Sequence, residues 1–434
     1  SLRENGKQNI TFFRRHSRQS EILLFGNSLK REKRSNLWIN EDTNKRCIEK
    51  DAKKLRQLKF GRVPFYEPGL DEILKKNIKS KRLKFTHEYK DNISNSDVIF
   101  ICVGTPPKKN GESDLSYIKQ CSKEIAKNLK GYTVIVSKST VPVGTSKIIE
   151  NILKKIKSKS SFDVISNPEF LREGSAVEDF LRPDRIIIGC RSLRAGVILK
   201  KIYKTLNRPY VITNNETAEI IKYANNSFLA NKITFINEIA DLCEKIGAKI
   251  ETVAKAIGLD GRIGPKFLHS GPGYGGSCFP KDIKSLIYQG NKNSVNLKII
   301  KAVDSANELR IKSLFKRIKE ITKNKFNNIE VGLLGISFKP NTDDIRQSPG
   351  IKLAKDLSKT KAKIKIYDPQ GMKNAKKELP KFIKFCNNEY EVAQNSNLLV
   401  IVTEWNQFKN LDLLKIKKLM KIIIRLYEQN ATPS

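Results

Sequence analysis

The sequence predicts an α/β protein in which two doubly wound parallel sheets are joined by a long central helix. Three observations predict this fold class. From about residue 83 to residue 190, short apolar runs alternate with loops and amphipathic stretches, which is typical of parallel sheets with crossover helices. One uninterrupted helical segment covers residues 215–247, and the α/β alternation resumes near residue 328. At 434 residues the chain also exceeds one ordinary core, so we expect two or three domains.

The first region contains four apolar runs with the character of buried strands. They lie in "SDVIFICVGTPP" (96–107), "GYTVIVSKSTVPVGT" (131–145), "FDVISNPEFLREG" (162–174) and "DRIIIGC" (184–190). The first three run directly into polar loops. Because ligands of doubly wound sheets bind at the carboxyl ends of the strands, we expect these three loops to face one crevice.

Residues 215–247 predict the long helix, because the segment has no proline and no internal glycine, and Asn215 and Gly247 suit its start and its stop. Apolar residues recur there at helical steps: Ile220, Ala224, Phe228, Ile236, Ile239 and Cys243. More helix is expected to about residue 325. Strands in 328–338, 361–369 and 397–405, with a helix "PGIKLAKDL" after the first, predict a second and smaller doubly wound domain.

The net charge of +38, from 83 Lys+Arg against 45 Asp+Glu, raises the question of a nucleic-acid partner. The lysines are spread along the whole chain, so we interpret them as solvated faces and expect no specific nucleic acid. The apolar runs fall well short of the roughly 20 residues that span a bilayer, so no membrane partner is expected. Seven scattered cysteines without a CxxC, and three histidines, favour a reducing cytoplasmic location without a metal.

The stretch "GPGYGGSCFPKD" (271–282) places Cys278 after a run of glycines. Its glycines satisfy G-x-G-x-x-G as text, but a dinucleotide fingerprint must leave a strand and open a helix. We therefore expect a flexible loop that lets a ligand approach the backbone. Cys278 is either a small buried hydrophobe or a nucleophile near Lys281, and the stretch by itself leaves both interpretations open.

Three further groups of polar residues are candidates for catalysis or ligand binding, and the simpler interpretation is that they are solvated surface residues. Lys222 and Asn226 are four apart on the predicted helix and could hold an oxyanion, although a solvated face is the simpler interpretation. Glu169 and Glu173 are candidate general bases. The stretch 338–349 is either a charged surface turn or a site for a phosphate-bearing ligand, with Lys339, Asp343, Asp344 and Arg346.

Four stretches, in this order and at these separations, closely resemble the UDP-glucose/GDP-mannose dehydrogenase family. They are "NPEFLREG", "KYANNSFLANKITFINEI", "GPGYGGSCFPKD" and "GISFKPNTDDIRQSP". The resemblance covers roughly residues 47–420, and "SNPEFLREGSAVEDFLRPDRIIIG" is most similar to the branch that acts on UDP-glucose.

The resemblance implies oxidation of the C6 alcohol of a nucleotide sugar to a carboxylate, with two NAD⁺ and a thioester on Cys278. A thiol is needed because the covalent adduct of the intermediate aldehyde can give up a second hydride. By the same match, Lys222 and Asn226 would stabilise the oxyanion. Asp282 and Thr140 would hold the catalytic water, and Glu169 would assist thioester hydrolysis.

The same match implies positions for both ligands. Residues matched to nucleotide-sugar binding are Phe170, Leu171, Arg172, Glu173, Lys222, Asn226, Phe267, Leu268, His269, Ser270, Gly271, Gly275 and Lys339. Residues matched to positions near NAD are Glu49, Lys54, Thr105, Thr140, Glu173, Lys281 and Arg346.

The implied architecture has three parts. These are an N-terminal NAD-binding Rossmann domain (1–212), a central helical dimerisation and catalytic domain (213–325), and a C-terminal Rossmann-like domain (326–434) for the UDP-sugar. Members of the family are commonly homodimers through the long helix, so we expect the same here.

Both ends of the chain depart from the family pattern. Glu49 matches the acid on the adenosine ribose, and the G-x-G-x-x-G turn should then lie near residues 27–32, where the chain reads "NSLKRE". Residues 1–46 and 422–434 are therefore off-pattern. We hypothesise reading-frame shifts or a damaged gene, and finding peptides from residues 12–45 by mass spectrometry of the natural protein would refute that. If the ends are real, NAD should bind poorly.

Three alternatives remain at this stage. One is a sister dehydrogenase acting on GDP-mannose or a UDP-N-acetylhexosamine, because sugar identity depends on few contacts. Another is an inactive relative that lacks the glycine-rich turn. The third is a non-catalytic protein that binds a nucleotide sugar or a polyanion, for which salt-sensitive DNA binding would be diagnostic.

Overall fold

The computed structural model describes residues 9–15, 44–156, 161–421 and 424–425. The chain forms two compact units, residues 1–224 and 225–434, and each is described by itself. The segment in which the sequence analysis looked for a glycine-rich turn, residues 27–32, lies outside the described residues, as does most of 422–434.

The first unit is built on an eight-stranded sheet with the order β3-β2-β1-β4-β5-β6-β7-β8. All neighbouring strands are parallel except β6 and β7. The strands are β1 (Asn9–Arg15), β2 (Asn44–Glu49), β3 (Leu83–Thr86), β4 (Val98–Val103), β5 (Thr133–Ser137), β6 (Phe162–Ser166), β7 (Ile186–Gly189) and β8 (Tyr210–Thr213). The order 3-2-1-4-5-6 over the first six strands is that of a dinucleotide-binding sheet.

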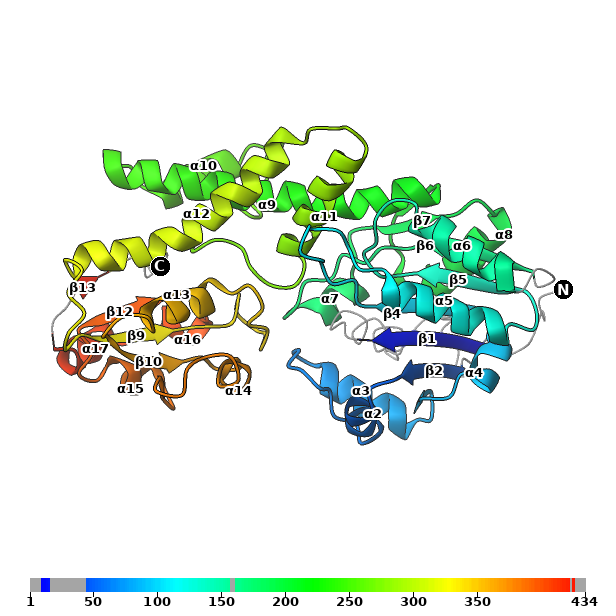
Figure 1. Ribbon diagram of the computed structural model, residues 1–434, viewed down its shortest axis with the longest axis horizontal. Helices are drawn as coiled ribbons and strands as arrows, with labels where there is room; N and C mark the ends of the chain where they lie inside the picture. Colours follow the sequence, from blue (N-terminus) through cyan, green and yellow to red (C-terminus); the bar gives the residue numbers. More distant parts are fainter. Residues whose placement is uncertain (1–8, 16–43, 157–160, 422–423, 426–434) are drawn as a thin grey trace. The chain divides into compact units, whose positions relative to one another are not determined.

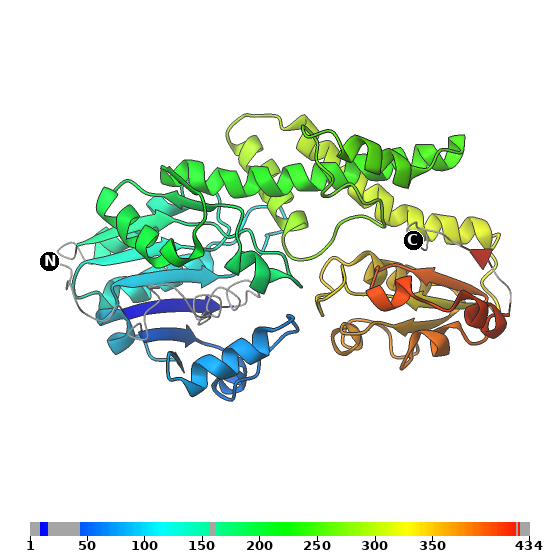
Figure 2. The same ribbon diagram turned by 180° about the vertical axis from the view of Figure 1, so that it is seen from behind.

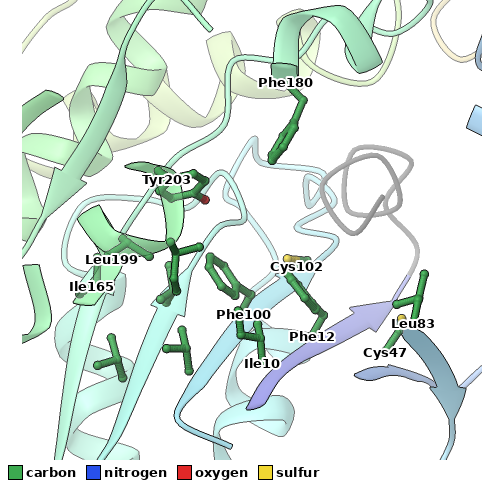
Figure 3. Close-up of a cluster of buried hydrophobic side chains, with 14 of the residues drawn as sticks. Ile10, Phe12, Cys47, Leu83, Phe100, Cys102, Ile165, Phe180, Leu199 and Tyr203 are labelled. Carbon is green, nitrogen blue, oxygen red and sulfur yellow. The ribbon is translucent and has the colours of Figure 1, made fainter. Parts of the chain in front are cut away.

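Helices cover both faces of this sheet, as expected of a doubly wound fold (Figure 1). One core packs α2 (Ala52–Lys59), α3 (Leu70–Lys79), α7 (Ala176–Leu181) and α8 (Leu193–Tyr203) on one face. A second core packs α4 (Lys90–Ser94), α5 (Ser116–Asn128) and α6 (Thr145–Ile156) on the other. Figure 3 shows the first core, in which Phe180 and Tyr203 reach from the helices over side chains of the strands.

Strand β1 lies in the segment that the sequence analysis set outside the family pattern, and no strand was predicted there. Ile10 and Phe12 are buried, and the Phe12 ring stacks on Phe100 of β4 with centroids 5.0 Å apart. This packing places β1 between β2 and β4, as the third of the eight strands in the sheet. The strand was missed because its apolar run is short and runs straight into charged residues.

The long predicted helix is confirmed as α9 (Asn215–Ile246). After it come α10 (Ile250–Gly258), α11 (Phe279–Lys292) and α12 (Lys298–Ile321), and α12 packs on α11 (Figure 2). The expected apolar stripe of α9 is only partly buried: Ile236 is fully buried, whereas Phe228 is 64% exposed. Across the described ranges, no helix combines the length and the apolar character that a bilayer crossing needs.

The second unit ends in a five-stranded parallel sheet with the order β11-β10-β9-β12-β13. Its strands are β9 (Glu330–Leu334), β10 (Lys363–Tyr367), β11 (Lys384–Phe385), β12 (Leu398–Ile401) and β13 (Ile424–Arg425). Its helices are α13 (Pro349–Leu357), α14 (Met372–Ala375), α15 (Glu389–Ala393), α16 (Asn406–Lys409) and α17 (Leu413–Leu419). Two doubly wound sheets with a long helix between them in sequence confirm the predicted fold class.

Candidate active site

Glu169 and Lys222 form a buried ion pair in the first unit. Glu169 lies in the loop after β6, Lys222 lies on α9, and both are about 4% exposed. The Lys222 Nζ is 3.5 Å from the Glu169 Oε1, and the Glu169 Oε2 accepts a hydrogen bond of 2.6 Å from the Leu171 N–H. The interpretation of Lys222 as part of a solvated face is therefore wrong, because the polar side of α9 is the side that packs inward.

The predicted sugar-binding residue Phe170 lies under two cations. The Lys222 Nζ is 5.0 Å and the Arg185 guanidinium carbon 3.9 Å from the centroid of its ring. A cation over an aromatic face is attracted by the ring quadrupole. Phe170 thus helps to hold the Lys222 ammonium beside Glu169.

A second buried lysine, which the sequence analysis did not single out, lies at the end of β5. The Lys138 Nζ donates a 2.8 Å hydrogen bond to the Asn167 Oδ1, and the Tyr203 hydroxyl donates to the same oxygen at 2.7 Å. The Asn167 amide in turn donates to the Ile187 carbonyl at 2.6 Å. These bonds fix the residue that opens the loop carrying Glu169. We name Lys138, Asn167, Glu169, Tyr203 and Lys222 the charge cluster.

Burial lowers the pKa of Lys138 to about 8, and nearby Glu169 and Cys102 oppose that shift. The Lys138 ammonium is also 5.3 Å from the centroid of the Tyr203 ring. Burial likewise raises the pKa of Cys102 to about 12, which keeps this thiol neutral. Below about pH 8 the Lys138 ammonium therefore adds a positive charge near Glu169.

The rest of the loop that carries Glu169 is held by another buried carboxylate. Glu67, which the sequence analysis also missed, accepts hydrogen bonds of 2.7 Å from the Gly174 N–H and 2.8 Å from the Ala176 N–H. The predicted ligand residue Glu173 directly precedes Gly174 and is buried. Arg172, a predicted sugar contact, forms an ion pair with Asp179 on α7.

The predicted cofactor residues of the first unit lie at the carboxyl ends of strands. Glu49 ends β2, is fully buried, and accepts a 2.8 Å hydrogen bond from the Asp51 N–H. Thr105 follows β4 and donates from its hydroxyl to the Thr140 carbonyl at 2.8 Å. Lys54 lies on α2, where its N–H is capped by Asp51. This is the edge at which doubly wound sheets bind nucleotides.

Cys278 lies at the N-terminus of α11 in the second unit and is partly exposed. Its sulfur is 3.6 Å from the Ser277 hydroxyl. One turn on, Asp282 is buried and accepts a 2.6 Å hydrogen bond from the Asn226 amide, and Lys281 also contacts it. The free N–H groups of a helix N-terminus favour negative charge, so the position suits a thiolate.

We name residues 271–278 the thiol loop; it follows no strand, which excludes a dinucleotide fingerprint there. Its glycines allow another segment of the same chain, residues 338–347, to pack closely against the loop. The Gly276 N–H donates to the Arg346 carbonyl at 2.9 Å. A Cβ on Gly275 would lie 2.4 Å from the Gln347 carbonyl oxygen, and one on Gly276 would lie 2.7 Å from the Phe338 ring.

The other predicted sugar residues of the second unit lie on either side of this contact. Phe267 has a positive φ of 66° and its ring lies 6.4 Å from that of Phe279. Leu268 is buried, His269 is exposed, and Ser270 and Gly271 are intermediate. The Lys339 ammonium lies 5.7 Å from the centroid of the Phe338 ring. Arg346, a predicted cofactor contact, is paired with Asp344 through bonds of 2.9 and 3.0 Å.

Three buried polar side chains that the sequence analysis missed contact the backbone of the thiol loop. They are Asn237 on α9 and Asn307 and Arg310 on α12. Asn307 and Arg310 are one helical turn apart, which was the available signal. Polar residues on a helix are usually solvated, so the spacing by itself does not single them out.

Comparison with known proteins places all three regions of the chain in one family. Residues 39–207 match the NAD binding domain of the UDP-glucose/GDP-mannose dehydrogenase family, residues 216–309 its central domain and residues 332–426 its UDP binding domain. A UDP-glucose 6-dehydrogenase of Rhizobium meliloti is 46% identical, over 86% of this chain and 87% of its own length. UDP-glucose 6-dehydrogenase TuaD of Bacillus subtilis is 43% identical, over 86% and 81%.

A solved structure of a UDP-glucose dehydrogenase from the archaeon Pyrobaculum islandicum has a TM-score of 0.89 and 32% identity, covering 97% of this chain and 98% of that one. A UDP-D-ManNAc dehydrogenase from Pyrococcus horikoshii has a TM-score of 0.81 at 22% identity, covering 96% and 94%, and shows the shared fold.

Proposed function

We propose, from the premise that this chain belongs to the UDP-glucose/GDP-mannose dehydrogenase family, that it oxidises the C6 alcohol of UDP-glucose to a carboxylate. Relatives that carry the name UDP-glucose 6-dehydrogenase are 43–46% identical over most of their length, which supports this sugar. The observation that carries the chemistry is the partly exposed Cys278 thiol at a helix N-terminus, one turn from the buried Asn226–Asp282 pair.

Cys278 acts as the nucleophile in the proposed reaction. Its thiolate adds to the C6 aldehyde, forms a thiohemiacetal, and after the second oxidation remains acylated as a thioester that water hydrolyses. The helix N-terminus favours the anionic sulfur before attack. The contacts of its loop hold the sulfur in one position, which is the condition for efficient covalent catalysis.

The remaining polar side chains take the roles that their contacts allow. Lys222 and Asn226 stabilise the developing oxyanion as a cation and an amide donor. Asp282 and Thr140 hold the water, and Glu169 assists thioester hydrolysis as a carboxylate with Lys222 as its counter-ion.

NAD⁺, when bound, accepts the hydride of each oxidation. The described part of the first unit fits this cofactor, because Glu49 ends β2 as a buried acid and the strand order reverses next to β1. Glu49 would hold the ribose and Lys54 would lie nearby. Thr105, Thr140 and Glu173, with Lys281 and Arg346 of the second unit, are the other proposed cofactor contacts.

The nucleotide sugar would bind through two stretches of loop and one lysine. The first stretch is Phe170 to Glu173, with Leu171 and Arg172 between them. The second is Phe267 to Gly271, with Leu268, His269 and Ser270, followed by Gly275. Lys339 supplies a cation for the anionic end of the ligand. We also propose the functional division into 1–212, 213–325 and 326–434.

We further propose a homodimer that forms along α9. Four apolar side chains of this helix are 48–66% exposed and recur at steps of seven, seven and four residues: Phe228, Phe235, Leu242 and Ile246. Such a spacing forms one seam suited to packing against a second helix. Phe235→Glu should yield monomers in sedimentation, whereas Lys84→Gln, at an exposed lysine of β3, should leave the assembly unchanged.

The test of the activity is turnover across a panel of sugars. The full chain with UDP-glucose and saturating NAD⁺ should release two NADH per sugar, because conversion of an alcohol to a carboxylate removes four electrons. GDP-mannose and a UDP-N-acetylhexosamine should turn over at least about 100-fold more slowly in kcat/KM. Faster turnover of either one would replace UDP-glucose as the substrate, and no NADH from any sugar would reject the proposal.

A further inference from the structure

The thiol loop is held by side chains that contact its backbone at two points. At the first, the Gly271 N–H donates to the Asn237 Oδ1 at 2.7 Å and its carbonyl accepts from the Arg310 Nε at 2.8 Å. At the second, the Tyr274 N–H donates to the Asn307 Oδ1 at 2.8 Å, and its carbonyl accepts from the Asn307 Nδ2 at 3.1 Å. The backbone N–H and carbonyl of Gly271 and of Tyr274 therefore all bond to side chains.

The side chains that make these contacts are buried and supported. Asn237, Asn307 and Arg310 are 3%, 6% and 8% exposed. Arg310 also contacts Asp241 of α9, and Asp241 accepts a second hydrogen bond, of 2.9 Å, from Arg317. Buried hydrogen-bonded polar groups are costly to displace, so α9 and α12 hold the loop in one conformation.

Aromatic packing connects these hydrogen bonds to Cys278. Gly273 has a φ of 106°, and a Cβ there would lie 2.8 Å from the Asn307 Oδ1. Only glycine therefore fits at this position beside the Asn307 side chain. The ring of Tyr274, whose backbone Asn307 holds, packs edge-on against Phe279 with centroids 5.9 Å apart. Phe279 directly follows Cys278 and begins α11.

We propose that Asn307 and Arg310, together with Asn237, are positioning residues that set the place and the reactivity of the Cys278 thiol. The proposal rests on the proposed function in one respect, namely that Cys278 is the nucleophile. When the hydrogen bonds from these side chains to the thiol loop are lost, the loop opens and the Cys278 thiol becomes more accessible to solvent. The thiol is then less often aligned with its substrate. A misplacement of about 1 Å can cost on the order of 100-fold in rate.

Site-specific alkylation separates this role from the overall activity, because it needs no turnover. The full chain is treated briefly with iodoacetamide and the labelling of each cysteine is followed by peptide mass spectrometry. In Asn307→Ala we expect Cys278 to label about fivefold faster while kcat falls about tenfold and KM changes little. Labelling of Cys190, which is partly exposed in the first unit, should be unchanged.

Two further variants on the same helix keep the test decisive. Arg310→Lys retains a donor for the Gly271 carbonyl and should give a smaller change in both readouts, and it serves if Asn307→Ala does not fold. Arg317→Gln removes bonds to Asp241 and Glu244 but no bond to the loop, so it should match the wild type. The proposal is overturned if Cys278 labelling in both loop variants equals that of Arg317→Gln, or if all cysteines label faster together. Failure of the wild type to turn over UDP-glucose would instead reject the proposed function and leave the labelling comparison valid.

Discussion

The charge cluster and the thiol loop hold their reactive groups by different physical means. In the cluster, the Glu169 carboxylate is paired with the buried Lys222 ammonium, and a second lysine, Lys138, lies nearby. In the loop, Cys278 is held through backbone hydrogen bonds to side chains and through glycines that fit against other backbone. One region controls charge, and the other controls position.

This difference follows from what each reactive group needs. A buried carboxylate costs several kcal/mol unless a counter-ion accompanies it, so Glu169 requires Lys222. A thiol is neutral until it ionises and can be held without a counter-ion, so its loop has to be positioned by geometry instead. Removing one member of the cluster should therefore cost stability and activity together, whereas changes in the loop should cost activity first.

The largest expected effect is that of Cys278→Ser. A serine hydroxyl does not form the acyl intermediate efficiently, so the yield of the carboxylate product should fall by about 10³-fold or more. The melting temperature should change by less than about 2 °C, because the thiol is partly exposed and the hydroxyl is smaller. Product is measured by chromatography and stability by calorimetry.

Cys190→Ser is the matched control, because Cys190 is also partly exposed but lies in the first unit. It should retain full activity. If Cys278→Ser still formed the carboxylate at the wild-type rate, no covalent role for this loop could stand.

Lys222→Met tests whether the charge cluster depends on its ion pair. It leaves the Glu169 carboxylate buried without its counter-ion, so we expect a loss of about 3 kcal/mol in the free energy of unfolding. Activity should fall about 100-fold, because an oxyanion stabiliser is lost. Denaturant unfolding and steady-state kinetics measure the two effects.

Adding Glu169→Gln to Lys222→Met removes the orphaned charge as well. The double variant should regain most of the lost stability, since a neutral pair tolerates burial, but it should regain no activity. Equal stability of the single and double variants would contradict a buried ion pair between these residues.

The third prediction concerns a buried lysine outside the cluster. Lys45 in β2 is 3% exposed, and burial together with the nearby Arg82 lowers its pKa to about 7. Between pH 7 and about 10.5 the unfolded chain binds a proton that the folded chain does not, so stability rises with pH over this window and is lowest below pH 7. Lys45→Leu should therefore raise the free energy of unfolding by about 3 kcal/mol at pH 6 and by less at pH 9.

Lys84→Leu is the control for this change, because Lys84 is an exposed lysine on the neighbouring strand β3. It should alter stability by less than about 0.5 kcal/mol at either pH. An equal gain at pH 6 and pH 9 in Lys45→Leu would mean that the charge of Lys45 is not what burial penalises.

The fold was largely predictable because it depends on local patterns. Strands β4, β5 and β9 are continuous apolar runs, and α9 has no helix breaker, so each could be predicted from its own residues. Strand β1 could not, because five residues before a charged segment carry too little signal. Its place depends on the stacking of Phe12 on Phe100, a contact between residues 88 positions apart in the sequence.

The candidate site was predictable only where a motif carried it. Cys278 and Glu169 were found in recognisable stretches, whereas Lys138, Glu67 and Asn307 act through partners far away in the sequence. A polar residue on a helix or after a strand is solvated in most proteins, so its burial follows from tertiary packing. Phe228 shows the opposite: an apolar residue of the predicted stripe on α9 is exposed, and this too follows from tertiary packing.

The smallest expected effect is that of Lys138→Met, and its pH dependence is what gives it value. The groups near the Lys138 ammonium are Glu169, Cys102 and Lys222, and its pKa is about 8. Below pH 8 the ammonium adds a second positive charge beside Glu169, and above pH 8 that charge is lost. The wild type should therefore exceed Lys138→Met about tenfold in kcat at pH 7 and by only about twofold near pH 9.5.

Tyr203→Phe removes the other hydrogen bond to the Asn167 Oδ1 without changing any charge, so its ratio to the wild type should stay constant with pH. A constant ratio for Lys138→Met as well would mean that Lys138 acts on the loop through its hydrogen bond alone, and the contrast between a region that controls charge and one that controls position would then rest on the Glu169–Lys222 pair.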